Sequence, residues 1–406
     1  MAATTKTANA TTTTAIAVTT IRTAANTTAK ATTIATITTT TTDLATRTMS
    51  NTFGRILQLT TFGESHGAAI GGVLDGYPAG IAIDKAFVDA EVRKRATGQS
   101  HFSSSRKETD EIEFLSGIYN GKSLGTPIAF IVRNTNQRPA DYDSLHYAYR
   151  PSHADYTYKA KYGIRDPRGG GRASARETLA RVVAGALAKM ALQQKNIRIK
   201  AFTSAIGPIE LNHDYTHYDL EQADANEMRC PDAETAAKMY DYLQQVKDGH
   251  DSAGGIVTCV VEGCPAGIGE PVYGKLQAAL ASAMLSIPSV KGFDYGGGFD
   301  MAHGRGSEMN DAFVLAHSEV HTKTNHSGGI QGGISNGEPI YFRVAFKPVA
   351  SIAMPQTTLT VAHEPTIIEI SGRHDVCVVP RAVAVVEAMA ALVVLDGLLQ
   401  HRATCL

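Results

Sequence analysis

The sequence lacks tryptophan, and it lacks an excess of charge of one sign: among its 406 residues, 38 Lys and Arg stand against 39 Asp and Glu. Proteins that bind nucleic acids usually show a clear basic excess, so this balance argues against a nucleic-acid partner. No uninterrupted run of about 18 apolar residues occurs, which argues against a membrane span. The hydrophobic fraction of 43% is still sufficient for a large buried core.

Cysteine is also scarce, and the five cysteines form no CxxC pair. This argues against a disulfide framework or a structural zinc site and favours a reducing, cytoplasmic compartment. His317 and His321 could share one helix face, but no third metal ligand is evident, so we expect no metal site. The sequence contains no GxGxxG or HExxH motif, and Ser116 stands where a P-loop ending in Gly121-Lys-Ser123 would need glycine.

Residues 1–48 form a different kind of sequence, in which twenty-two residues are Thr and twelve are Ala. Such a segment has too few apolar side chains to offset the entropy lost on ordering it. Patterning typical of a globular protein begins at Met49. We therefore predict a Thr/Ala-rich disordered leader, or a start codon assigned too early, over residues 1–48, and a folded, functional domain over residues 49–406.

Hydrophobic periodicity predicts alternating strands and helices after Met49. Asp84 is expected to cap a helix that reaches about Arg95. Ser174, with Glu177 three residues later, predicts a capping box for the strongest helix, which extends to Leu192. The order of strands, turns and helices indicates helices layered on sheets. Further strands are expected over residues 55–61, 69–74, 125–132, 254–262 and 340–346, and further helices over residues 271–286 and 381–399.

Charged residues and glycines concentrate in four segments. Residues 62–67 place a histidine between glycines, residues 325–334 are glycine-rich, and residues 371–377 set Arg, His and Asp side by side. Residues 150–176 contain five Arg, two Lys, one His and three Tyr, and they include three consecutive glycines before the predicted helix start. Amides at a helix N-terminus and nearby guanidinium groups bind phosphate and carboxylate, so this last segment predicts an anion site. The alternative is a solvated basic surface.

These segments resemble chorismate synthase, and the resemblance extends over nearly all of residues 49–406. The matching stretches are TTFGESHG (60–67), RPSHADYTY (150–158), RGGGRASARET (168–178), NHSGGI (325–330) and GRHD (372–375). The resemblance implies an α+β fold, a β-α-β sandwich of helices layered with antiparallel-rich sheets, assembled as a homotetramer. It implies a lyase that converts 5-enolpyruvylshikimate 3-phosphate into chorismate and phosphate by anti-1,4-elimination, the last step of the shikimate pathway to aromatic amino acids. The family requires reduced FMN (FMNH2), although the reaction involves no net redox change.

The same resemblance implies roles for individual residues. His66 would be the acid toward the leaving phosphate, His153 would protonate or stabilise the reduced flavin, and Asp375 would assist proton removal through flavin N5. Histidine suits such tasks because its pKa of about 6.5 lets it hold or release a proton near neutrality. The implied contacts to anionic groups of the substrate or of NADP are Arg95, His101 and Arg176. The implied FMN contacts are Arg172, Ala173, Ser174, Pro288, Ser289, Gly332, Lys347, Pro348, Val349, Ala350, Ser351 and Arg373.

Two positions depart from the family pattern: His101 replaces an arginine often assigned to an anion, and Pro288 occupies a commonly polar position. No extra nucleotide motif suggests an intrinsic flavin reductase, so we expect an external flavin reductase or another source of reduced FMN. Two other hypotheses stay open on the residues alone. One is a phosphotransferase that binds a nucleotide with the arginine-rich segment, and the other is an anion- or flavin-binding protein without turnover.

Overall fold

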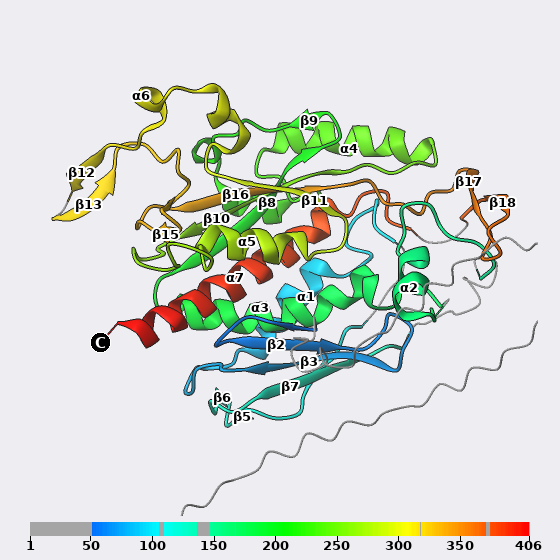
Figure 1. Cartoon of the computed structure of the whole chain (residues 1–406), viewed down its shortest axis with the longest axis horizontal. Coiled ribbons are helices and arrows are strands. Elements are labelled where there is room, and N and C mark those ends of the chain that lie inside the picture. Colours follow the sequence, from blue (N-terminus) through cyan, green and yellow to red (C-terminus); the bar gives the residue numbers. More distant parts are fainter. Residues whose placement is uncertain are drawn as a thin grey trace, which may run out of the picture. The chain divides into compact units, whose positions relative to one another are not determined.

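Two five-stranded sheets lie on either side of a layer of helices (Figure 1). The structure, a computed structural model, describes residues 51–104, 109–135, 146–166, 168–316, 318–370 and 374–405. The strand order is β1-β2-β3-β7-β4 in the first sheet and β11-β16-β10-β8-β9 in the second, and all neighbours are antiparallel. The first sheet comprises β1 (Thr52–Phe53), β2 (Gln58–Phe62), β3 (Ala69–Asp75), β4 (Ile112–Phe114) and β7 (Ile128–Arg133). The second comprises β8 (Arg198–Ile206), β9 (Ile209–Glu210), β10 (Gly255–Glu262), β11 (Val290–Tyr295) and β16 (Ile340–Phe346).

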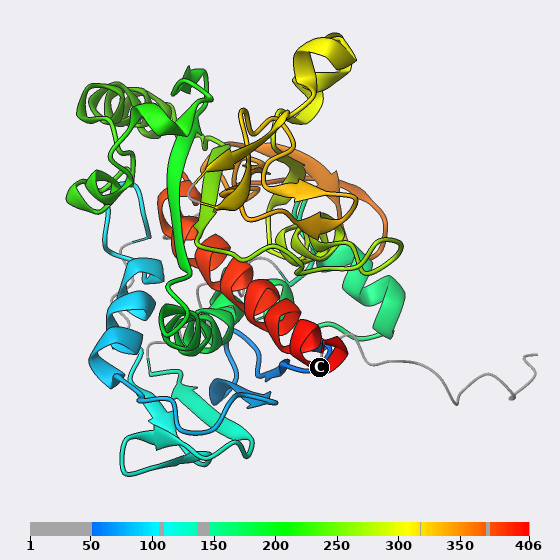
Figure 2. The ribbon, with the colours of Figure 1, turned by 90° about the vertical axis from the view of Figure 1, so that its left-hand side faces the viewer.

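Four helices form the layer between the sheets: α1 (Lys85–Arg95), α3 (Thr178–Gln193), α5 (Leu276–Leu285) and α7 (Val379–Thr404). α7 crosses the layer diagonally and packs against α3, α5 and the strands β8 and β10 of the second sheet (Figure 2). α3 in turn contacts β2 and β3 of the first sheet. This layering confirms the predicted α+β class and the β-α-β sandwich.

The position of α3 and α7 between two sheets explains why they are apolar on nearly all sides. Every residue of α3 from Thr178 to Leu192 except Arg181 is buried. The two helices cross closely at Gly185, where a β-carbon would lie 2.3 Å from the β-carbon of Ala388. Among the described residues, α7 is the helix with the length and apolarity to cross a membrane, but 83% of its apolar window is buried inside the protein, as in a core helix of a soluble domain.

Three buried charges join the helices of this layer. The ammonium group of Lys189 on α3 donates to carboxylate oxygens of Glu91 on α1 and Glu387 on α7, each at 2.5 Å. Burial alone would lower the pKa of Lys189, but the two carboxylates outweigh it and raise that pKa above its ordinary value. A second oxygen of Glu387 accepts from the backbone amide of Ala201 on β8, at 2.8 Å. The cluster therefore ties the helical layer to the second sheet.

Smaller elements surround this sandwich. α4 (Ala233–Asp248) contacts β8 and β9 on the outer side of the second sheet, and the hairpin of β12 (Phe313–Ala316) and β13 (Glu319–Thr322) stands away from the rest (Figure 1). The other hairpins are β5 (Ile118–Tyr119) with β6 (Lys122–Ser123), β14 (Ile330–Gln331) with β15 (Ile334–Ser335), and β17 (Gln356–Leu359) with β18 (Pro365–Ile368). The remaining helices are α2 (Asp155–Tyr162), α6 (Gly306–Met309) and 3-10 turns at Gly171–Ala173, Ala175–Glu177, Tyr215–His217, Leu220–Ala225 and Gly298–His303.

Several sequence predictions hold, and others fail for local reasons. The Asp84 side chain caps α1 by accepting from the amide of Phe87. The capping box at Ser174 is wrong, because the Ser174 hydroxyl accepts from Arg176 in a separate 3-10 turn and α3 begins only at Thr178. The helix expected over residues 271–286 begins at Leu276. His321 lies in strand β13 rather than on a helix, and His317 is outside the described residues.

Candidate active site

A cleft of about 900 Å³ lies where the end of β2, the start of α2 and a run of three glycines meet. Its walls come from residues 60–64, 153–155, 164–166 and 169–172 and from Tyr158 and Tyr162, with Arg181 of α3 at one side. The segments at residues 62–67 and 150–176, which the sequence singles out separately, are therefore adjacent in the fold. The cleft volume suits a ligand of small-molecule size.

His153 lines this cleft and is held by a buried carboxylate. Its Nδ1 lies 3.0 Å from Oδ1 of Asp155. The same oxygen also binds the guanidinium groups of Arg150 and Arg165. Burial alone would raise the pKa of Asp155, but hydrogen bonds from Arg150 and His153 outweigh it and hold that pKa far below its ordinary value. Asp155 is therefore an ionised acceptor, and Nδ1 of His153 must carry the proton of their hydrogen bond.

His66 lies behind the wall of the cleft rather than on its surface. The side chain is 3% exposed, and its Nδ1 lies 3.1 Å from the Ser65 hydroxyl. The wall in front of it is Gly169, since a β-carbon at that residue would lie 2.5 Å from Nδ1 of His66. Asn134 fixes the same segment by donating to the carbonyl oxygens of Glu64 and Gly67. Both predicted histidines thus lie at one cleft: His153 lines it, and His66 lies behind its wall.

The arginines around the cleft are arranged in pairs that share a buried carboxylate. Asp155 binds Arg150 and Arg165, with nitrogen–oxygen distances of 2.7 and 3.1 Å. In the same way Glu177 lies 3.7 Å from Arg172 and 2.9 Å from Arg181, and Asp110 lies 2.5 Å from Arg176 and 3.9 Å from Arg95. Each of these carboxylates therefore binds two guanidinium groups at once. The residues of this set are the carboxylates Asp110, Asp155 and Glu177 and the six arginines Arg95, Arg150, Arg165, Arg172, Arg176 and Arg181.

This pairing changes the prediction of an anion site at the helix N-terminus. The amides of Arg176, Glu177 and Thr178 donate to Ser174 and Ala175, so they already have partners within the chain. The guanidinium of Arg172 donates to Thr61 and to the carbonyl oxygen of Gly63. The side chains of the arginine pairs, rather than these three amides, are therefore the groups with which the site would attract an anion.

A second group of predicted cofactor residues meets at the end of α5. The amide of Lys347 donates to the carbonyl oxygen of Ser289 at 2.9 Å, which brings residues 288–289 beside residues 347–351. Ser289 has a φ of 73°, a left-handed conformation uncommon for a side-chain-bearing residue. Burial and the neighbouring Lys291 lower the pKa of Lys347.

Gly332 lies elsewhere in the same chain. Its neighbour Gly333 accepts from the amide of Leu276 at the start of α5, whereas Ser289 follows the end of that helix. A ten-residue helix is about 15 Å long, so the two predicted contacts are separated by roughly that distance. Figure 1 likewise shows β15 at the opposite side of the molecule from α2. Arg373, the last predicted flavin contact, is outside the described residues.

Asp375 and His101 both lie at the segment of residues 101–104. Oδ1 of Asp375 accepts from the amide of Ser104 at 2.8 Å, and Oδ2 accepts from Arg381 at 2.5 Å. His101 is exposed; its amide donates to Glu227, and its Nε2 lies 2.8 Å from the ammonium group of Lys247. A lysine thus brings a positive charge to the position where the family pattern has arginine. Among the described residues, no cluster of three His, Cys, Asp or Glu side chains fits a metal ion.

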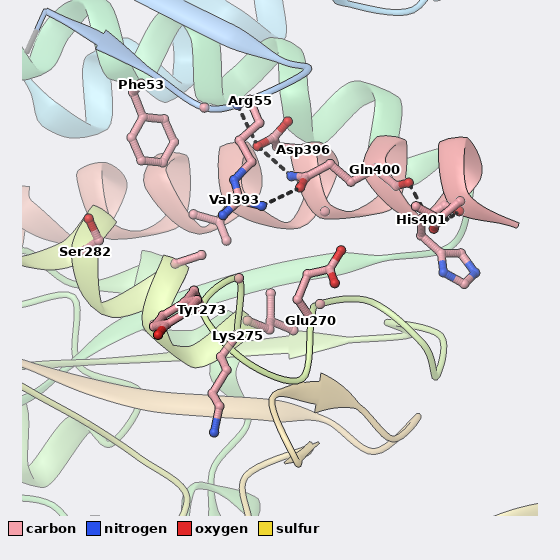
Figure 3. Close-up of a pocket in the computed structure, with 18 of the residues that line it drawn as sticks. Phe53, Arg55, Glu270, Tyr273, Lys275, Ser282, Val393, Asp396, Gln400 and His401 are labelled. Carbon is pink, nitrogen blue, oxygen red and sulfur yellow. Dashed lines mark hydrogen bonds between the residues drawn. The ribbon is translucent and has the colours of Figure 1, made fainter. Parts of the chain in front are cut away.

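A further cavity, of about 390 Å³, lies near the C-terminal end of α7 (Figure 3). Asp396 on α7 accepts from the backbone amides of Arg55, Ile56 and Leu57, so it fixes the turn between β1 and β2. The loop that carries Glu270, Tyr273 and Lys275 faces α7 across this cavity (Figure 3). The polar groups of this cavity hold the turn that follows β1 against α7.

Sequence reasoning missed the shared carboxylates. Asp155 stands inside the matched segment 150–158, but its sequence position does not reveal that two arginines and His153 converge on it. Asp110 and Glu177 are likewise ordinary acidic residues in the sequence. The available signal was the excess of arginines in a buried, glycine-rich segment, since buried guanidinium groups need acidic partners.

Comparison with known proteins was consistent with this arrangement. The sequence model of the chorismate synthase family matches residues 57–399. The chain is 58% identical over 356 residues to a chorismate synthase from Bacteroides fragilis, covering 88% of this chain and 99% of that protein. It is 58% identical to one from Parabacteroides distasonis, covering 87% and 98%. A crystal structure of chorismate synthase matches with a TM-score of 0.69 and 31% identity, covering 86% of this chain and 92% of the other.

Proposed function

Because the chain belongs to the chorismate synthase family, whose members are lyases of the shikimate pathway, we propose that it converts 5-enolpyruvylshikimate 3-phosphate into chorismate and phosphate by anti-1,4-elimination, using reduced FMN. The observation that carries the proposal is the meeting of the two histidine segments at one cleft. His153 lines the cleft, and His66 lies directly behind its Gly169 wall.

The charge of the cleft suits this substrate, which carries one phosphate and two carboxylates. Three arginine pairs, each sharing one carboxylate, concentrate six guanidinium groups in and next to the segments that form the cleft. A buried guanidinium attracts an anion more strongly than a solvated one, because the low local dielectric weakens screening. The arginines need not leave their carboxylates to contribute this field. The substrate would therefore be held by the field of the pairs and by the groups that line the cleft.

The residues present fit a flavin mononucleotide in part. A phosphate and a hydroxylated chain need cations and hydroxyl groups, which Arg172, Ser174, Ser289, Lys347 and Ser351 supply. Ser289 and Lys347 are already joined by a backbone hydrogen bond, which supports their assignment to one binding surface. A bound reduced flavin would supply transient electron donation, a chemistry that requires no net redox change. All twelve FMN contacts named from the sequence, Gly332 and Arg373 included, stay predictions.

The roles proposed for the chain's own groups concern protons. We assign His66 as the donor to the leaving phosphate on one face of the substrate. Nδ1 of His153 donates its proton in the hydrogen bond to Asp155, so Nε2 is the atom that would hold or release a proton at the cofactor. Asp375 is assigned to assist the removal of the proton from carbon 6. Both of its oxygens accept hydrogen bonds, from Ser104 and Arg381, which would fix the orientation of the carboxylate.

Assembly, supply and location complete the proposal. The β12–β13 hairpin exposes Phe313, Val314, Leu315 and Val320, and a two-stranded hairpin with such side chains is marginally stable alone in water. This supports the proposal of a homotetramer in which other copies cover the hairpin. We further propose that a separate flavin reductase supplies the reduced cofactor, that the enzyme acts in the cytoplasm, and that residues 49–406 carry the whole activity.

The deciding experiment measures anaerobic release of phosphate from 5-enolpyruvylshikimate 3-phosphate with chemically reduced FMN and, separately, with oxidised FMN. We expect turnover with the reduced cofactor only. Addition of NADPH to the oxidised cofactor then tests for an intrinsic reductase, and we expect no turnover. A folded, flavin-binding protein that releases no phosphate under any of these conditions would disprove the proposed activity.

A further inference from the structure

One buried ion pair touches the surroundings of both histidines, although no catalytic role has been given to either of its members. Arg150 and Asp155 are 7% and 3% exposed, and they are joined by two parallel hydrogen bonds of 2.8 and 2.7 Å. We propose that this pair positions His153 and His66 together, so that the two proton-transferring groups are held by one structural unit. The inference rests on the proposed function only where it treats the two histidines as proton-transferring groups. Whether the ion pair positions them can be tested separately.

The link to His153 is a direct hydrogen bond. Oδ1 of Asp155 lies 3.0 Å from Nδ1 of His153, 2.7 Å from Nη2 of Arg150 and 3.1 Å from Nη1 of Arg165. Oδ2 accepts from Nε and from the backbone amide of Arg150, at 2.8 and 3.1 Å. Five donors on one carboxylate exceed its four or so lone-pair directions, so Asp155 has no capacity left to accept a substrate proton. It serves to fix the ring of His153 in the tautomer with hydrogen on Nδ1.

The link to His66 passes through a glycine. Nη2 of Arg150, which binds Asp155, also donates to the carbonyl oxygen of Gly169 at 3.1 Å. Gly169 has a φ of 81°, and a β-carbon on it would lie 2.5 Å from Nδ1 of His66 and 3.0 Å from the hydroxyl of Ser65. The backbone that Arg150 holds is therefore the surface against which the His66 ring packs. A displacement of Arg150 should therefore shift the ring of His66 as well as that of His153.

Other pairs in the same segment lack this connection. Arg168 and Asp166 form a bidentate pair, but Arg168 is exposed, Asp166 is half-buried, and the pair joins only two residues of one turn. Arg165 contacts Asp155 and the carbonyl oxygen of His146. The cost of removing two charges from water makes a buried ion pair weak as a source of stability, so the reason to keep one here is the geometry that it imposes.

The test uses two variants, Asp155→Asn and Arg150→Lys, in the full chain. Asn keeps the shape of Asp155 but can offer a donor to Nδ1, and Lys keeps the charge of Arg150 but cannot bridge Asp155 and Gly169 with a planar fork. A matched control is Asp294→Asn, because Asp294 and Arg343 form a bidentate pair of similar distances, 2.9 and 2.6 Å, on the second sheet. Nitrogen-15 NMR of the labelled histidines, assigned with His66→Ala and His153→Ala, reports tautomer and environment. Steady-state assays with reduced FMN give kcat and KM.

We expect Asp155→Asn to abolish the fixed Nδ1–H tautomer of His153, and both variants to shift the His66 resonances. The control, which breaks a bidentate pair elsewhere in the fold, should leave both histidines unchanged. We expect kcat to fall about 10–100-fold, the range seen when carboxylates that orient catalytic or metal-bound histidines are removed, with a smaller change in KM. Unchanged His66 resonances in Arg150→Lys would overturn the coupling of the two sites. Wild-type kcat in Asp155→Asn despite a lost tautomer would overturn the positioning role. If His66→Ala and His153→Ala keep full turnover, the proposed catalytic roles fail, whereas the NMR result still stands on its own.

Discussion

Gly169 offers the sharpest test of how His66 is held. The residue lies between the cleft and the buried imidazole ring, with a φ of 81° that residues with a side chain rarely adopt. A β-carbon there would meet Nδ1 and Cε1 of His66 at 2.5 and 2.6 Å, well inside van der Waals contact. The change Gly169→Ala therefore adds one methyl group to a place where the backbone is strained and the neighbour is a predicted proton donor.

The magnitude follows from the two penalties. A non-glycine residue in a left-handed conformation costs about 1–3 kcal/mol. Forcing one methyl group into a filled space costs about 1–3 kcal/mol more unless the neighbour moves. The neighbour that can move is the imidazole ring, which is packed but not covalently constrained. We expect it to turn away and to lose part of the roughly 10²–10⁴-fold acceleration that a well-placed proton donor provides.

The matched control is Gly163→Ala at the end of α2. Gly163 has a φ of 74°, but a β-carbon there would meet nothing within 4 Å, so only the backbone penalty applies. Anaerobic phosphate release and thermal unfolding should be measured for both variants. Gly163→Ala should lower the melting temperature with little change in kcat, and Gly169→Ala should lower both. Equal kcat values in the two variants would refute the reasoning that Gly169 holds His66 in place.

Four further predictions are more direct. Replacing His66 or His153 by Ala should remove most turnover while FMN still binds, as measured by phosphate release and flavin fluorescence; wild-type rates in both would exclude their assigned roles. A chain that begins at Met49 should keep full activity and the same unfolding temperature, whereas failure to fold would contradict a dispensable leader. Lys189→Met should lower the free energy of unfolding by about 3–5 kcal/mol because its two carboxylate partners lose their counter-charge, and a loss below about 1 kcal/mol in urea unfolding would contradict this. Because the folded state holds the pKa of Asp155 below its ordinary value, its carboxylate contributes stability above about pH 4 that is lost as pH falls; the difference in unfolding free energy between the native chain and Asp155→Asn should therefore be larger at pH 7 than in acid, and a difference independent of pH would argue against an ionised Asp155.

The secondary structure was predictable where the local pattern was consistent. The strand over residues 340–346 and the capped helix from Lys85 to Arg95 have the predicted bounds because alternation and an N-cap residue are local signals. The start of α3 was not predictable, because the Ser174 hydroxyl accepts from an amide of a separate 3-10 turn and the Glu177 carboxylate binds Thr61 and Arg181. The partner of Ser174 lies outside the expected capping geometry, and Glu177 binds Thr61, which is remote in sequence. No local sequence pattern predicts either partner.

The site shows the same limit at a larger scale. Sequence motifs identified the segments that carry His66 and His153, and the fold places those segments at one cleft. They did not show that His66 is buried behind Gly169 or that the arginines are paired through shared carboxylates. These features depend on distances between residues as far apart as Thr61 and Glu177, which a single sequence does not provide.

The arginine pairs also explain how a site can be rich in guanidinium groups and remain folded without its substrate. Unpaired arginines at this density would repel one another at low dielectric, and the apo protein would be destabilised. A carboxylate between two arginines, as at Asp155, Glu177 and Asp110, removes most of that repulsion. Because the pairs are buried, added salt would screen their attraction for an anion less than it screens an exposed basic surface, so the affinity for a trianionic substrate should weaken only modestly between low and moderate ionic strength.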